Sequence, residues 1–169
     1  MLELGKAGSA GAERGVLPVL RDGVVAATLG ASNWKESATA VVGEREWVFA
    51  KVRGELTARW AGEAEDAVRL RARQTSFWKG TWAVDLGGAT VERQTVSMWK
   101  GTHRFVADGR EVALTGSTGG WSPRPTLTAD GSLPLEHQVF LLWMELVISR
   151  RNTAVVAVGA GVAVVGGSS

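Results

Sequence analysis

The sequence predicts a mainly β protein: a closed antiparallel barrel of repeated hairpins that encloses one hydrophobic C-terminal helix at about 133–150. Asp-Gly and Gly-Gly turn signals recur at short intervals through the first 130 residues, and short segments of alternating polarity separate them. A six-residue segment is repeated, and one stretch near the C-terminus is almost wholly apolar. Together these three observations favour a barrel that surrounds a helix.

Length and composition set the domain organisation. The chain has 169 residues, of which 45% are hydrophobic and 21% charged, so it can form one domain with a sizeable core. Residues 1–15 are rich in Gly and Ala, and we expect a flexible tail there, followed by a single domain at 16–169.

The strands are predicted from period-two alternation. In one segment the apolar residues Val68, Leu70 and Ala72 alternate with Arg69, Arg71 and Arg73. Trp82, Val84 and Leu86 form the apolar face of a second such segment. Alternation over segments this short is typical of half-buried antiparallel strands.

The repeat predicts two equivalent hairpins. Ser76-Phe77-Trp78-Lys79-Gly80-Thr81 recurs as Ser97-Met98-Trp99-Lys100-Gly101-Thr102, and an earlier segment, Ser32-Asn33-Trp34-Lys35, has part of the same pattern. A fixed period indicates a repeated supersecondary unit. Because Trp78 and Trp99 occupy equivalent positions, we expect their indoles to belong to the framework of the fold.

A helix is predicted where the alternation ends. Ser132 can cap it, Pro134 suits its first turn, and Glu136 suits the positive end of its dipole. Every residue of Val139–Ile148 except Glu145 is apolar, which indicates a helix enclosed by protein on all sides. The Val-rich segment 154–165, which contains glycines, is predicted to form one or two final strands.

Glu145 is the buried polar candidate. A carboxylate in the middle of an apolar helix must be paired, protonated or placed against water, since its burial alone is costly. We expect an arginine or a strand amide as its partner, in an ion pair or hydrogen bond that fixes the rotation of the helix. A functional role for a perturbed carboxylate is the alternative.

Motifs for the common site chemistries are absent. The absence of Cys excludes disulfides, thiolate metal sites and cysteine nucleophiles. His103 and His137 are the two histidines, so a three-histidine metal site is excluded, and no glycine cluster has the spacing of a nucleotide-binding loop. We therefore favour a non-catalytic protein and expect no catalytic residue, metal or cofactor.

Charge and hydropathy bear on partners and location. The net charge of +2 makes nucleic acid an unfavoured partner. The apolar runs Val139–Ile148 and 154–167 are shorter than the roughly 20 residues of a membrane span, and the start of the chain lacks the pattern of a signal peptide. We expect a cytoplasmic protein. The sequence is also compatible with a peripheral position at a membrane.

The clearest surface feature is cationic. Arg69, Arg71 and Arg73 share one face of a predicted strand, while Lys79 and Lys100 lie beside tryptophans in the repeated hairpins. Basic side chains near amphipathic aromatic rings can bind phosphate headgroups or nucleic acid. An ordinary solvated arginine face, opposite buried residues, is the alternative interpretation.

The chain resembles the tubby C-terminal-like superfamily, which includes LURP-one-related proteins and phospholipid scramblases. The resemblance covers about residues 16–165 and depends on Trp78-Lys79-Gly80, Trp99-Lys100-Gly101, the Asp-Gly turns and the apolar segment from Leu135 to Ile148. It implies a β-barrel around a buried C-terminal helix. Tubby proteins bind phosphoinositides and scramblases act on phospholipids, so it also implies an anionic lipid ligand, although none of the functional residues of those families matches a position here.

The leading hypothesis is a binding module for anionic ligands such as phospholipid or phosphoinositide headgroups. A small enzyme or ligand carrier with its site at a barrel mouth is the alternative, and it would require a pocket that collects Asp85, His103, Glu136 or His137. A third possibility is assembly into oligomers through exposed tryptophans.

Overall fold

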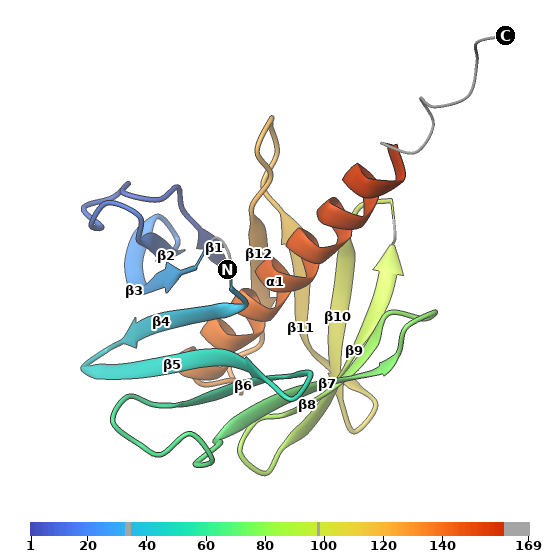
Figure 1. Ribbon diagram of the computed structural model, residues 1–169, viewed down its shortest axis with the longest axis horizontal. Coiled ribbons are helices and arrows are strands. Elements are labelled where there is room, and N and C mark those ends of the chain that lie inside the picture. Colours follow the sequence, from blue (N-terminus) through green and yellow to red (C-terminus); the bar gives the residue numbers. More distant parts are fainter. Residues whose placement is uncertain (33–34, 98, 161–169) are drawn as a thin grey trace, which may run out of the picture.

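The computed structural model describes residues 1–32, 35–97 and 99–160. In these residues twelve antiparallel strands form a closed barrel, and a helix runs through it (Figure 1). The predicted fold class is therefore confirmed.

The bounds of the elements follow the turn signals closely. The strands are β1 (Leu2–Leu4), β2 (Leu17–Arg21), β3 (Val24–Ala31), β4 (Ser37–Val42), β5 (Arg45–Val52), β6 (Glu55–Trp60), β7 (Leu70–Ser76), β8 (Thr81–Asp85), β9 (Thr90–Ser97), β10 (Thr102–Ala107), β11 (Arg110–Ser117) and β12 (Pro125–Ala129), and the helix is α1 (Leu135–Ala160).

Each strand pairs with its neighbours in sequence, and β1 pairs with both β2 and β12 to close the barrel. In such a meander the connections alternate between the two ends of the barrel. The connections β1–β2, β3–β4, β5–β6, β7–β8, β9–β10 and β11–β12 lie at the end where α1 leaves, which we call the exit end. The remaining connections lie at the entry end, where α1 begins.

The predicted flexible tail at 1–15 is wrong for Leu2–Leu4, which form β1. Leu2 and Leu4 are buried in the core, and Glu3 between them faces outward to Arg124. Three residues are too few for alternation to be recognised in the sequence beside a Gly/Ala-rich segment. The pairing with β12, more than 120 residues away in the chain, makes them a strand.

The helix begins close to the predicted start but continues to Ala160, beyond the predicted end near 150. The strand predicted at 154–165 is therefore wrong for 154–160, while 161–165 lie outside the described residues. A closed barrel has no free strand edge with which this Val-rich segment could pair. Because backbone groups must find partners, the segment continues the helix.

The barrel interior is filled by α1. The six consecutive residues Val139–Met144 are all buried, because the wall surrounds the helix on every side. Phe49 of β5 packs against Phe140 and Trp143, with ring centroids 5.5 and 5.2 Å apart. The prediction of an enclosed helix at this position is confirmed.

The repeated segments form equivalent turns. In each turn the backbone N–H of a lysine donates to the hydroxyl of the serine three residues earlier: Lys35 to Ser32, Lys79 to Ser76 and Lys100 to Ser97, at 3.0, 3.2 and 3.3 Å. Gly80 and Gly101 follow with φ of 62° and 58°, a conformation that favours glycine. In the two complete copies, the shared spacing of serine and glycine thus specifies the turn itself.

The burial of β1 leads to a first prediction. Leu4→Ala should lower the free energy of unfolding by about 2–5 kcal/mol, because it leaves a cavity in the barrel wall. Urea denaturation followed by circular dichroism measures the change. Val24→Ala, at an exposed position, is the control and should change it by less than about 0.5 kcal/mol. Equal stability of the Leu4 variant and the parent would show that β1 does not close the barrel.

Candidate functional site at the exit end of the barrel

The two ends of the barrel differ in charge. Within the described residues, the exit-end connections hold seven basic residues, Lys6, Arg14, Lys35, Arg53, Lys79, Lys100 and Arg124, and two acidic residues, Glu13 and Glu36. The entry-end connections hold seven acidic residues, Asp22, Glu44, Glu63, Glu65, Asp66, Asp108 and Asp130, and one basic residue, Arg69. The connections at the two ends therefore differ in charge, although the net charge of the chain is near zero.

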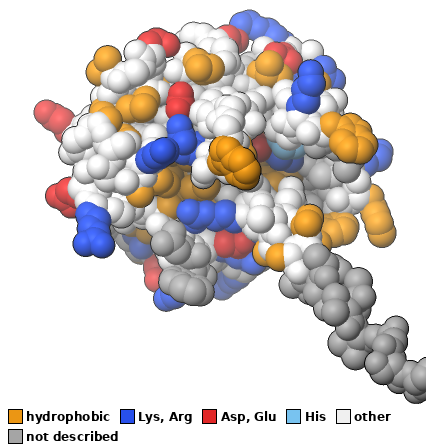
Figure 2. Space-filling model, turned by 90° about the horizontal axis from the view of Figure 1, so that it is seen from above, with side chains coloured by type: hydrophobic (Ala, Val, Ile, Leu, Met, Phe, Trp, Pro, Cys, Tyr) orange, Lys and Arg blue, Asp and Glu red, His pale blue; other side chains and the backbone are white. Residues whose placement is uncertain are grey.

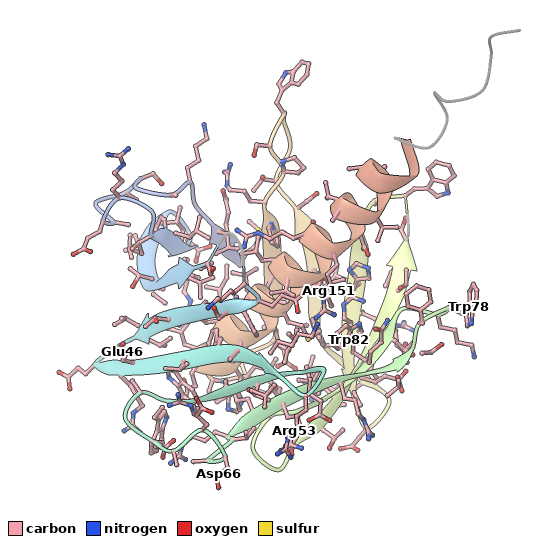
Figure 3. All side chains as sticks on the ribbon, viewed as in Figure 1. Glu46, Arg53, Asp66, Trp78, Trp82 and Arg151 are labelled. Carbon is pink, nitrogen blue, oxygen red and sulfur yellow. The ribbon has the colours of Figure 1, made fainter. Side chains whose placement is uncertain are left out.

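Three tryptophans stand out from the exit end. Trp78 is 93% exposed in the β7–β8 turn, and Trp99 and Trp121 are fully exposed in the β9–β10 and β11–β12 turns. Figure 3 shows Trp78 at the tip of its hairpin, directed away from the barrel. In the view from above, hydrophobic side chains project among Lys and Arg side chains (Figure 2).

The prediction that Trp78 and Trp99 belong to the framework is therefore wrong. The repeat is needed for the turn, but the serine hydroxyl and the glycine conformation form that turn without help from the indole. The tip of a tight turn directs its side chains outward. Trp34, in the earlier copy, lies outside the described residues, whereas Trp143 on the helix is buried as predicted.

A lysine follows two of the three exposed indoles, Trp78 and Trp99. The ammonium groups of Lys79 and Lys100 form no ion pair with any residue that the structure describes, so their charge is available to a ligand. Val155 and Val156 of α1 are also exposed, where the helix projects past the barrel wall. The exit end thus combines an aromatic rim, unpaired cations and an apolar stretch of helix.

A pocket of about 490 Å³ opens at the exit end between α1 and the β9–β10 and β11–β12 connections. Its walls include Lys100, His103, Arg124 and Asn152, and Glu145 lies at its base. Arg124 is already engaged, because its guanidinium donates to the carbonyl of Leu4 at 2.7 Å and to the carboxylate of Glu3 at 3.1 Å.

Below this pocket Glu145 is paired as predicted. Its carboxylate accepts hydrogen bonds from Arg93 Nε at 2.5 Å and Nη2 at 3.1 Å, and it lies 3.1 Å from His103 Nδ1. Arg93 is 2% and Glu145 6% exposed. The sequence predicted an arginine partner. It did not identify Arg93 or His103 as the partners of Glu145, since they lie 52 and 42 residues away in the chain.

Electrostatics keep Glu145 ionised despite its burial. Burial alone would raise the pKa of this carboxyl, but hydrogen bonds from His103 and Arg93, together with their charges, hold the pKa below its ordinary value. Arg93 also donates to the carbonyl of Gly80 at 2.9 Å. The network therefore connects the helix to the turn that carries Trp78 and to the strand that follows the Trp99 turn.

The structure separates the predicted basic residues. Arg69 precedes β7 at the entry end, pairs with Glu63 at 2.6 Å and lies over the ring of Trp60. Arg71 pairs with Glu55 at 3.2 Å, and Arg73 is exposed on the barrel wall. Of the five predicted residues, Lys79 and Lys100 lie at the exit end, on the β7–β8 and β9–β10 turns.

The residues named for the enzyme alternative are also separated. His103 lines the exit pocket, whereas Glu136 and His137 line a cavity at the entry end. The carboxylate of Asp85 accepts hydrogen bonds from the backbone N–H groups of Gly87 and Gly88, both at 3.0 Å, and so shapes a turn.

Two further observations concern the described residues alone. No group of His, Asp or Glu side chains among them has the arrangement of a metal site. No helical stretch among them is both long and apolar enough to span a bilayer.

Comparison with protein-family models, curated proteins and solved structures finds no match to this chain.

The Glu145 network leads to a second prediction, about acid stability. Because the pKa of Glu145 is lowered in the folded state, its contribution to stability is present above its ordinary value of 4.5 and is lost as the pH falls through the folded value. Glu145→Gln should lower the free energy of unfolding by about 3–5 kcal/mol at neutral pH, since it leaves Arg93 buried and unpaired. Denaturation across pH measures this, and the two curves should converge below pH 4.5.

Glu55→Gln is the control for that experiment, because it removes the partner of Arg71 in a surface ion pair. It should change stability by less than about 1 kcal/mol. A difference between parent and Glu145→Gln that stays constant across the whole pH range would contradict the assigned role of the carboxylate.

Proposed function

We propose that this protein binds the surface of membranes that contain anionic lipids, with its exit end against the bilayer. The observation that carries the proposal is the set of three exposed tryptophans, Trp78, Trp99 and Trp121, on consecutive turns of the end at which the basic residues collect. The protein acts as a peripheral, non-catalytic binding module.

Two physical effects act together at this surface. Indole rings favour the headgroup region of a bilayer, where the ring is in a largely apolar environment and its N–H stays hydrated. Lys or Arg near an anionic leaflet contributes about 1 kcal/mol for each side chain. Either effect alone gives marginal attachment, and the combination gives stable but reversible attachment.

The charge polarity orients the protein. With the exit end toward the negative leaflet, the seven acidic residues of the entry-end connections point away from it. Any other orientation moves acidic side chains toward anionic headgroups. The exposed segment with Val155 and Val156 then lies on the membrane side as well.

The resemblance to the tubby C-terminal-like superfamily supports the same class of ligand, since its members bind or act on phospholipids. Anionic lipids are concentrated in the cytoplasmic leaflet, which agrees with the predicted cytoplasmic location. From the sequence we expected the strand face with Arg69, Arg71 and Arg73 to bind the ligand. The proposal assigns binding to the exit end instead, because Arg69 and Arg71 are already paired with carboxylates.

The third prediction concerns charge. The protein should sediment with phosphatidylcholine vesicles that contain phosphatidylserine and remain free with phosphatidylcholine alone, and binding should weaken as salt shortens the Debye length. Lys79→Glu and Lys100→Glu should each weaken binding about tenfold or more. Arg73→Glu makes the same charge change on the barrel wall and should have a much smaller effect. Equal losses for all three variants would show that net charge, and not the exit end, determines binding.

The fourth prediction concerns the indoles. Replacement of Trp78, Trp99 and Trp121 together by Ser should abolish vesicle binding and leave the urea midpoint nearly unchanged, because all three side chains are exposed. Val24→Ser, an exposed apolar residue at the entry end, is the control and should bind vesicles normally. Brominated lipids should quench tryptophan fluorescence in the parent but not in the triple variant. Full vesicle binding by the triple variant would refute the proposed orientation.

A further inference from the structure

A second cavity lies at the entry end, on the side that the proposed function turns away from the membrane. Its volume is about 720 Å³, within the range of roughly 300–1,000 Å³ typical of small-molecule sites. We call it the entry pocket. It lies beside the start of α1, between β4 and β5 on one side and β7 and the β8–β9 turn on the other.

The floor of the entry pocket is apolar. Trp47, Leu70 and Leu86 are buried members of the core that line the cavity, and Val42 completes this surface. Val42, Trp47 and Leu70 come from β4, β5 and β7, and Leu86 comes from the β8–β9 turn. The floor can therefore cover an apolar molecule on one side without any change in the core.

Two guanidinium groups enclose the indole of Trp60 at the rim. The central carbons of Arg45 and Arg69 lie 3.8 and 3.1 Å from the ring centroid, and two groups this close cannot share one face of the ring. Arg69 is neutralised by Glu63 at 2.6 Å. Arg45 forms no ion pair or hydrogen bond with any described residue, so its planar set of N–H donors is available at the pocket wall.

Trp60 itself leaves a donor unused. Among the described residues, Trp60 Nε1 is the one buried side-chain nitrogen or oxygen without a hydrogen-bond partner. A buried donor without an acceptor costs about 1–3 kcal/mol. This nitrogen has almost no accessible surface, so a ligand can reach it only when the groups that cover it move. The indole that carries this nitrogen lines the entry pocket.

The remaining polar groups limit the charge of a ligand. Glu136 lines the pocket, and Glu63 lies at its rim beside Arg69. Burial lowers the pKa of His137, so its imidazole is neutral at neutral pH and can donate or accept one hydrogen bond. The acidic surroundings disfavour phosphates with two negative charges, whereas one carboxylate matches the fork of a single arginine.

From this arrangement we propose that the entry pocket binds a small carboxylic acid with an apolar body. The carboxylate lies against the guanidinium of Arg45 at the rim, and the apolar body lies against Trp47, Leu70 and Leu86. Binding here is independent of membrane attachment, because the two sites are at opposite ends of the barrel.

The test uses decanoate as the probe and decanol as its uncharged counterpart, with titration calorimetry on the full chain. Decanoate should bind saturably at one site, and Arg45→Met should weaken it about tenfold or more while binding of decanol changes little. Arg53→Met removes an exposed arginine at the exit end and should leave both affinities unchanged. Absence of saturable decanoate binding, or equal effects of the two arginine variants, would overturn the proposal.

Nuclear magnetic resonance shows which indoles lie beside bound decanoate, whatever the affinity of the acid. The indole N–H signal of Trp60 is identified as the one lost in Trp60→Phe, and decanoate should shift it, because the acid binds the Arg45 guanidinium that lies over this ring. The triple Trp-to-Ser variant of the exit end should bind decanoate normally even though it fails to bind vesicles. A shift confined to the signals of Trp78, Trp99 and Trp121 would show that the acid binds the membrane-facing rim, and the proposal would then be wrong.

Discussion

A carboxylate inside a closed barrel must find its counter-charges on the surrounding wall, and the arrangement of this protein depends on that constraint. Glu145 is the charged residue in an otherwise apolar stretch of α1, and it accepts two hydrogen bonds from Arg93 while it also contacts His103. Apolar burial is non-directional, and buried hydrophobic side chains lie all around the helix at Val139–Met144. The bidentate pair, with its fixed geometry, selects one rotation.

The same network determines what the exit end presents to its surroundings. Arg93 also holds the carbonyl of Gly80, so the turn that displays Trp78 is tied to the helix through a chain of buried hydrogen bonds. Trp78 therefore projects from a turn that the buried ion pair supports. The antiparallel meander adds a second constraint, because alternate connections lie at opposite ends of the barrel. The basic turns are therefore separated from the acidic turns. The proposed function depends on this separation and not on the small net charge.

Much of the fold could be predicted from local patterns, because the information lay within a few residues. The positive φ values at Asp22 and Asp108, each followed by glycine, are those expected for tight hairpin turns, and Ser76 and Ser97 accept the same hydrogen bond at equivalent places in the repeat. The site was less predictable. Repetition showed that Trp78 and Trp99 are equivalent, but it could not show that they are exposed. The length of α1 was likewise underestimated, since β-propensity is informative only where a strand edge is open to pairing.

The sequence by itself determined the fold class, the hairpin turns, the enclosed helix and the need of Glu145 for a partner, because each follows from periodicity, turn chemistry or the cost of a buried charge. The tertiary structure alone decided which residues meet. It brought Arg93 and His103 to Glu145 and placed Leu2 and Leu4 in the wall beside a strand from the other end of the chain. It also placed Arg45 and Trp60 beside the entry pocket. The physical reason is that these contacts join residues far apart in the chain, and the closure of the barrel determines their distances.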